Sequence, residues 1–228
     1  MEAISINGNE PNLKVEQART LKTPRLPANM MLKSMFLTFD ILYGKGRSLP
    51  KVLVLEILAR YPYWAWEHGS YNYLSKWHCD VKSVALEKVE MALRHIQMGR
   101  EAQDNEQWHM LLWMDLCQQK GIRLSWVKHW LLPRCMTWVY FYLTRFMYRL
   151  KPVWSFAMNA AFESHAEHEY MLYAQEHPEF DMEPVDSVWF KVYPRQKTLG
   201  DLVRRVGLDE RVHMQNSLEE IERLNVPK

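Results

Sequence analysis

The sequence predicts an all-α protein, and three observations support this prediction. Hydrophobic residues make up 48% of the 228 residues while only 8 are glycine, which leaves few turns for a sheet of many short strands. Apolar residues recur at helical spacing along most of the chain. The 11 prolines concentrate near the ends of these segments. The length suits one domain, so we expect a polar N-terminal arm over residues 1–29 and a single helical domain over residues 30–228.

Three helices are predicted in the first half of this domain. Residues 30–43 are apolar, with only Lys33 and Asp40 charged, and they end at a glycine-rich stop. A second helix runs from about residue 51 to residue 76 and contains Pro62, which lies near its start or kinks it. Residues 81–119 form one long helix that closes at a Lys-Gly pair.

Three further helices are predicted in the second half. Ser125 can cap a helix that runs to about residue 150, and Pro152 can open the next helix, which runs to about residue 176. Residues 177–197 form the only long loop that the pattern predicts. Thr198 can cap the last helix, which ends at about residue 224.

Overall composition excludes several classes of protein. There are 29 Lys and Arg residues against 27 Asp and Glu residues, so the net charge of +2 does not suit a strongly basic nucleic-acid binder, and we expect no nucleic-acid partner. The three cysteines form no CxxC pair, which argues against a disulfide scaffold and against a thiolate zinc site. The N-terminal stretch contains acids and lacks an apolar core, unlike a secretory signal.

One stretch departs strongly from this balanced charge. Residues 116–162 contain no Asp or Glu, but they carry seven cations among many Trp, Tyr, Phe, Leu and Met residues. This composition is typical of a helix that lies on an anionic bilayer surface. In the interior of this stretch, residues 125–150, the longest uncharged run is Cys135 to Thr144, which is far shorter than the ~20 residues that a membrane-spanning helix needs. We therefore expect monotopic membrane association, with the apolar helix over residues 30–43 as a second contact; a buried core helix with cationic flanks is the alternative.

Two Glu-x-x-His pairs, on separate predicted helices, suggest a metal site. They are Glu106 with His109 and Glu210 with His213. Positions i and i+3 of a helix lie about 60° apart, so each carboxylate and imidazole can converge on one metal ion. With Glu67 and Glu163 on two other helices, the order along the chain is E, ExxH, E, ExxH, which is the pattern of di-iron and di-manganese carboxylate proteins.

The expected fold is accordingly a ferritin-like four-helix bundle that houses a di-iron carboxylate site, with additional short helices for monotopic membrane association. Four carboxylates would neutralise two divalent ions, and two imidazoles, one per metal, would leave positions open for dioxygen. Glu-x-x-His pairs on exposed helix faces are common and usually only solvated. The apolar neighbours of Glu106 and Glu163 favour a buried site instead.

Over roughly residues 50–222 the chain resembles the alternative oxidases, including the plastid terminal oxidases. Residues 105–109, NEQWH, are similar to the family's N-E-R-M-H motif. Residues 198–203, TLGDLV, and 209–213, DERVH, resemble its T-L-R-D-V-V and A-D-E-A-H motifs at the same separation. Residues 162–170, FESHAEHEY, align with its L-E-E-E-A-x-H-x-Y motif.

The resemblance implies a membrane-bound di-iron quinol oxidase that reduces O2 to water without pumping protons. Its substrates would be quinol and O2, its partner a lipid surface, its location the cytoplasmic face of a bacterial inner membrane, and a homodimer is a possible assembly. The resemblance makes Tyr170 the tyrosine near the metal and makes Asn105 and Asp209 the residues that orient ligands. The metal ligands that it implies are Glu67, Glu106, His109, Glu163, Glu210 and His213, which would hold two Fe ions.

Three departures from the family pattern keep other functions open, and the first is Phe162-Glu163-Ser164-His165-Ala166 in place of its L-E-E-E-A motif. The family's L-E-T motif corresponds to Trp66-Glu67-His68, and the arginine that it places near quinol, five residues before the first ligand, corresponds to Pro62. His68 and His165 flank ligand positions and could carry protons. One alternative is a di-iron oxygenase that hydroxylates or desaturates a lipophilic organic substrate. Another is a non-enzymatic helical protein of the membrane surface.

Overall fold

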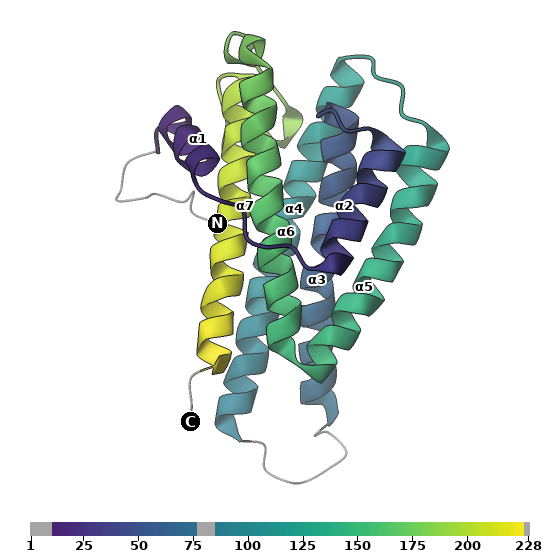
Figure 1. Cartoon of the computed structure of the whole chain (residues 1–228), viewed down its shortest axis with the longest axis vertical. Coiled ribbons are helices and arrows are strands. Elements are labelled where there is room, and N and C mark those ends of the chain that lie inside the picture. The colour runs from purple at the N-terminus through teal and green to yellow at the C-terminus, as the bar shows by residue number, and fades with distance from the viewer. Residues whose placement is uncertain (1–10, 77–84, 226–228) are drawn as a thin grey trace. The chain divides into compact units, whose positions relative to one another are not determined.

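The structure is a computed structural model that describes residues 11–76 and 85–225 (Figure 1). Seven α-helices lie in these residues, which confirms the predicted all-α class. The chain divides into two units, each described below by itself. Unit 1 comprises Met1–Ser48 and Ala160–Gln215, and unit 2 comprises Leu49–Asn159 and Asn216–Lys228.

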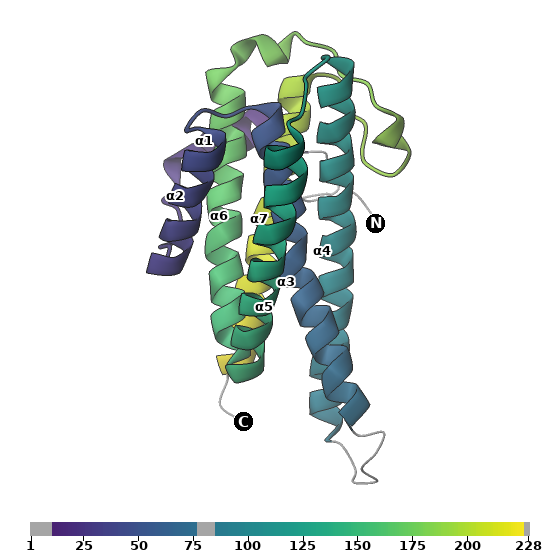
Figure 2. The same cartoon turned by 90° about the vertical axis from the view of Figure 1, so that its right-hand side faces the viewer.

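Unit 2 is built around α3 (Leu49–Ser75), which packs against α4 (Leu86–Gln119) and α5 (Leu132–Leu150) (Figures 1 and 2). A π-helical turn, η2 (Val127–Leu131), leads into α5, and the first residues of α6 and the last residues of α7 complete the unit. Aromatic residues dominate the core, because large flat rings bury much apolar area. This core contains Tyr63, Trp66, Ala102, Tyr148 and Phe156.

Helices α3 and α4 run antiparallel, and their contacts define a register. Arg60 donates to the side-chain oxygen of Gln107, while Nε of Arg100 lies 2.8 Å from Oε1 of Glu67. Next to Arg100, a Cβ atom at Gly99 would lie only 2.8 Å from the carbonyl oxygen of Tyr63. The two backbones approach so closely that a side chain at position 99 would force them apart.

Unit 1 contains α1 (Leu13–Lys22), α2 (Met30–Tyr43), most of α6 (Pro152–Glu176) and most of α7 (Leu199–Asn225). Two short 3-10 turns, η3 (Pro178–Asp181) and η4 (Val188–Lys191), lie in the connection between α6 and α7. Helices α6 and α7 also run antiparallel, as two contacts show. Nε of Arg211 lies 2.8 Å from Oε1 of Glu167, and a Cβ at Gly207 would lie 3.0 Å from the Cβ of Tyr170.

Most predicted elements are confirmed, some to the residue. Helix α2 and helix α6 have the predicted bounds, and Oγ1 of Thr198 accepts a hydrogen bond from the backbone N–H of Asp201 at 3.1 Å, as a helix cap does. Helix α3 continues through Pro62. Of the predicted helix over residues 81–119, residues 86–119 are helical and residues 81–84 lie outside the described residues.

Helix α1 was not predicted, because its stability comes from contacts with distant parts of the chain. Arg211 of α7 donates to Glu16 and, at 2.6 Å, to the hydroxyl of Thr20. That hydroxyl in turn donates to Glu167 of α6 at 2.6 Å. A polar ten-residue helix is marginal alone, so this buried network accounts for its presence.

Candidate metal centre

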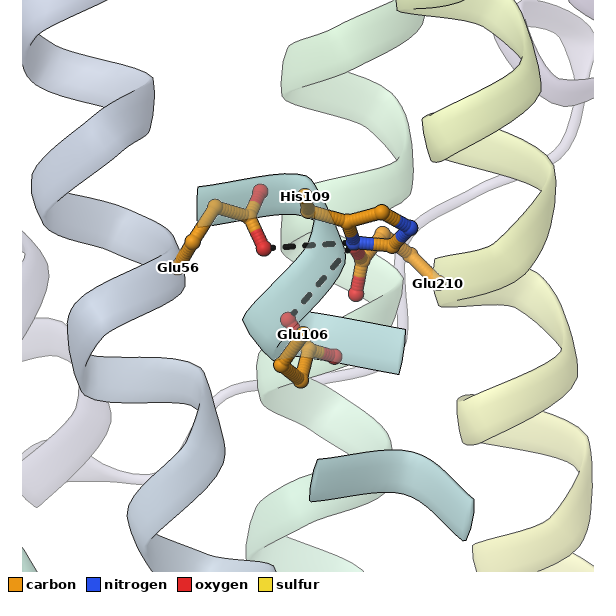
Figure 3. A group of neighbouring side chains, drawn as sticks. All are labelled: Glu56, Glu106, His109 and Glu210. Atoms are coloured by element: carbon orange, nitrogen blue, oxygen red, sulfur yellow. Dashed lines mark hydrogen bonds and ion pairs between the residues drawn. The ribbon is translucent and has the colours of Figure 1, made fainter. Parts of the chain in front are cut away.

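A first triad of metal-binding side chains lies inside unit 2 and comprises Glu56, Glu106 and His109 (Figure 3). Nδ1 of His109 lies 3.3 Å from Oε2 of Glu56 and 3.8 Å from Oε2 of Glu106. One ligand atom of each residue lies within 4.8 Å of those of the other two. All three side chains are almost completely buried. Figure 3 also labels Glu210, which belongs to unit 1 and to the second triad.

The helix geometry of unit 2 explains the first triad. Glu106 and His109 share one face of α4 because they are three residues apart. Arg60 lies opposite Gln107 in the antiparallel register, so His109, two residues further along α4, faces α3 about two residues before Arg60. Glu56 lies within one turn of this position. It is the only charged residue in the run from Val52 to Ala59.

A second triad lies inside unit 1 and comprises Glu163, Glu210 and His213. Glu163 comes from α6, and the Glu-x-x-His pair comes from α7, where Nδ1 of His213 lies 3.7 Å from Oε2 of Glu210. The ligand atoms again lie within 4.8 Å of one another, and the three side chains are buried. The antiparallel pairing of Glu167 with Arg211 places Glu163 one turn away, opposite His213.

Glu67, which the sequence predicts as a metal ligand, lies apart from both triads. Glu67 belongs to neither of the metal-binding groups found in residues 11–76 and 85–225. Its carboxylate instead accepts hydrogen bonds from Arg100 at 2.8 Å and from Gln103 at 2.9 Å, and it is partly exposed. Arg100 precedes Glu106 by six residues, so Glu67 lies opposite a point about 9 Å further along α4.

Glu56 could have been found from two signals in the sequence. A lone carboxylate within an eight-residue apolar run is costly to bury unless a cation balances it, so such a residue is a candidate ligand. In an antiparallel hairpin of the second and third predicted helices, residues near the start of one helix also lie opposite residues near the end of the other. The exact register, however, depends on the close contact at Gly99, which only the folded structure shows.

The other predicted site residues occupy buried positions near the triads along their helices. Tyr170 is fully buried and follows Glu163 by seven residues, so both lie on the same face of α6. Asn105 precedes Glu106, and its Oδ1 has no hydrogen-bond partner in the part of the chain that the structure describes. The carboxylate of Asp209 accepts from the hydroxyl of Tyr193 at 2.6 Å and pairs with Arg205 at 3.0 Å.

The two histidines that flank predicted ligand positions differ in their surroundings. His68 is exposed and accepts a hydrogen bond from Nε of Arg145 at 3.3 Å. His165 stacks on Phe36 with ring centroids 3.9 Å apart. Burial lowers the pKa of His165 to about 4, although the nearby Glu169 opposes this shift. His165 is therefore neutral near pH 7 and is a poor proton carrier there.

The donor atoms of both triads suit a metal ion. Each triad offers two carboxylates and one imidazole, a set that matches the charge of one divalent ion and the ligand preferences of iron, manganese and zinc. The protein thus contains two buried Glu/His groups that could hold metal ions. No protein-family model, curated protein or solved structure matches the chain, so these two groups are the main guide to its function.

Proposed function

We propose that this chain is a membrane-associated di-iron quinol oxidase that oxidises two quinols for each O2 reduced to two waters, without pumping protons. In this proposal the two triads hold one iron ion each and together form one dinuclear centre in a ferritin-like four-helix arrangement. One observation carries the proposal: both Glu-x-x-His pairs are buried, and each meets a further carboxylate from the neighbouring helix of its own unit.

The charge of the donor set supports two metal ions. Glu56 and Glu106 neutralise one divalent ion, and Glu163 and Glu210 neutralise a second. His109 and His213 contribute one nitrogen ligand to each ion. With Glu56 in place of Glu67, the order E, ExxH, E, ExxH along the chain is preserved.

Glu56 as the first ligand also supports the resemblance to the alternative oxidases. The family's L-E-T motif is more similar to Leu55-Glu56-Ile57 than to Trp66-Glu67-His68, because the leucine is retained. The family has an arginine five residues before its first ligand, and that position now falls on Lys51. Lys51 is buried and basic, like the arginine of the family. With Glu67 as the first ligand, this position would instead fall on the uncharged Pro62.

Iron bound at these ligands would supply the electron transfer from quinol to O2. The protein's side chains would hold the two ions, keep bulk water out and orient the ligands. Asn105 suits the last role, because its buried side-chain oxygen can accept a hydrogen bond from a group in the site. Tyr170 lies two turns of α6, about 10 Å along the axis, from Glu163, so it suits the donation of an electron.

The exposed face of η2 and α5 supports the membrane part of the proposal. Trp126 and Trp130 stack with ring centroids 4.9 Å apart, and the guanidinium of Arg134 lies 4.2 Å from the ring centroid of Trp130. Large apolar side chains continue along α5, where Trp138 and Phe146 are exposed. Within residues 11–76 and 85–225 no helix has the length and hydropathy to cross a bilayer, so we propose that quinol reaches the site from a lipid surface on which α5 lies.

The decisive experiment combines iron analysis with oxygen uptake by membranes that contain the protein. We expect two iron ions per chain in a magnetically coupled pair, and quinol-dependent O2 uptake that cyanide does not inhibit. Glu163→Ala should abolish this uptake. Glu176→Ala, on the same helix but exposed, should leave it unchanged.

Other outcomes would identify a different function. An iron-loaded protein that consumes O2 only with a lipophilic organic substrate would be an oxygenase. A protein that binds no iron, manganese or zinc would be a non-enzymatic helical protein. An EPR signal of isolated high-spin ferric iron would show two separate mononuclear sites and would contradict the dinuclear centre.

A further inference from the structure

A buried hydrogen-bonded network lies in unit 2, apart from the first triad. The hydroxyl of Tyr148 lies 2.6 Å from Nδ1 of His95, and Nε2 of His95 lies 2.8 Å from Oε1 of Glu220. Ser70 contacts the same hydroxyl at 2.8 Å. Arg94 holds both oxygens of Glu220 with two bonds of 2.9 Å. These residues come from α3, α4, α5 and the end of α7, and all belong to unit 2.

One arrangement of protons fits this network when His95 is neutral. Glu220 can only accept from His95 when it is ionised, so a neutral His95 carries its proton on Nε2 and has its lone pair on Nδ1. Tyr148 must then donate its proton to Nδ1 of His95, and Ser70 donates to Tyr148. The phenolic proton thus already points at a base at hydrogen-bond distance.

The charges around the network hold it in this state. Burial raises the pKa of Glu220, but the hydrogen bonds from His95 and Arg94 outweigh this effect and lower the pKa to about 2. Burial also raises the pKa of Tyr148 to about 12, so the phenol keeps its proton near neutral pH. A proton moved from Tyr148 to Nδ1 of His95 would form an imidazolium, and the ionised carboxylate of Glu220 at Nε2 would stabilise its positive charge.

Aromatic rings connect this network with the α3 segment that carries the first triad. The rings of Tyr148 and Phe156 have centroids 6.2 Å apart, those of Phe156 and Trp66 are 4.3 Å apart, and those of Trp66 and Tyr63 are 5.1 Å apart. Tyr63 follows Glu56 by seven residues and so lies on the same face of α3, about 10 Å along the axis. All four rings belong to the buried core of unit 2.

We propose that Tyr148 is a redox-active tyrosine that uses His95 as its proton acceptor. In the forward step Tyr148 loses one electron to a one-electron oxidant, and its phenolic proton moves to Nδ1 of His95. The products are a neutral phenoxyl radical and an imidazolium that Glu220 stabilises; reduction by one electron returns the proton to Tyr148. In the enzyme, and resting here on the proposed function, the oxidant is the oxidised iron centre, reached through Trp66 and Tyr63.

Geometry separates this role from a purely structural one. A buried tyrosine needs only one hydrogen-bond partner, and Ser70 would satisfy it. The second partner is an imidazole whose other nitrogen faces a carboxylate, and that carboxylate is fixed by Arg94 at two points. Such an arrangement orients a base, as a carboxylate does behind a catalytic histidine.

The test uses the metal-free full-length protein and a photogenerated ruthenium(III) tris-bipyridine complex as the one-electron oxidant. We expect a phenoxyl radical, detected by transient absorption and EPR, that lives at least ten times longer in the wild type than in Tyr148→Phe. Tyr142→Phe is the matched control, because Tyr142 lies on the same helix but is exposed. His95→Asn keeps a hydrogen-bond acceptor near the phenol but not a base, so it should remove the long-lived radical as well.

A measurement on the wild type alone covers the case in which these variants fail to fold. Electron–nuclear double resonance on the trapped radical should show one exchangeable proton hydrogen-bonded to the phenoxyl oxygen, coupled to histidine nitrogen in protein labelled with ¹⁵N-histidine. Equal radical lifetimes in wild type and Tyr148→Phe, or a radical without histidine coupling, would overturn the proposal. Because the protein is metal-free, this failure is distinct from a failure of the proposed oxidase activity, which appears in iron content and O2 uptake.

Discussion

Nδ1 of His109 lies 3.3 Å from Oε2 of Glu56, and this contact joins the Glu-x-x-His pair of α4 to helix α3. The contact indicates that the α3 carboxylate of the first triad is Glu56 rather than Glu67. Glu67 lies eleven residues further along α3. The two residues have the same chemistry and share a helix. They therefore provide a matched pair for testing which one binds metal.

We expect Glu56→Ala to lower the affinity for iron(II) or manganese(II) at least tenfold, or about 1.4 kcal/mol, because a direct ligand is lost. Glu67→Ala should leave the affinity within a factor of about two, since Glu67 only pairs with Arg100 and Gln103 and such partly exposed pairs contribute little. Calorimetric titration of metal-free protein measures both values. A larger loss in Glu67→Ala than in Glu56→Ala would contradict the proposal that Glu56 is the ligand.

The comparison of Glu56 with Glu67 shows what could be predicted from the sequence. Each Glu-x-x-His pair lies within one helix, so local periodicity alone places Glu106 beside His109 and Glu210 beside His213. The partner on α3 depends on how two helices slide along each other. This register is a tertiary property, and no local pattern encodes it.

The same distinction holds for the fold. The bounds of α2 and α6 follow from glycine, proline and apolar spacing, which act within a few residues. Helix α1 depends instead on Arg211, which is nearly two hundred residues away in the chain. The hydrogen bonds of His95 to Tyr148 and to Glu220 join three helices, so no local sequence pattern predicts them.

A second prediction concerns the close approach of α3 and α4 at Gly99. A Cβ there would lie 2.8 Å from a backbone carbonyl of α3, so Gly99→Ala should separate the helices and destabilise the protein by about 1–3 kcal/mol. For a chain of this length the melting temperature should fall by about 5 °C. Gly46→Ala is the control, because a Cβ at position 46 meets no atom within 4 Å. Thermal unfolding of metal-free protein, followed by circular dichroism, compares the two; equal melting temperatures would show that the contact is not tight.

A third prediction concerns the pH dependence of stability. The folded-state pKa of Glu220, about 2, lies below the ordinary value of 4.5, so its ionised form stabilises the folded protein above about pH 4.5, and this contribution is lost as the pH falls toward 2. The shift corresponds to at most about 3 kcal/mol. In Glu220→Gln the free energy of unfolding should be lower at pH 7 and should fall less between pH 5 and pH 3 than in the wild type.

Urea unfolding at several pH values measures this difference. Glu219→Gln is the control, since Glu219 is exposed and its only described ion pair is with Arg223 on the surface of the same helix. Its profile should follow that of the wild type. Parallel profiles for wild type and Glu220→Gln would show that the network around His95 does not stabilise the charge of Glu220.

The last prediction tests the exposed aromatic face of α5. Trp138 and Phe146 lie on this face, and Arg134, Arg145 and Arg149 of the same helix can interact with anionic headgroups. We expect the protein to sediment with vesicles that contain phosphatidylserine, and binding should weaken as salt is raised because the charges are screened.

The double variant Trp138→Ser, Phe146→Ser should bind at least tenfold more weakly. Met182→Ser removes an even more exposed apolar side chain from the connection between α6 and α7, so it should not change binding if α5 is the contact surface. If Met182→Ser loses binding, or if the double variant binds as well as the wild type, the membrane contact does not lie on α5.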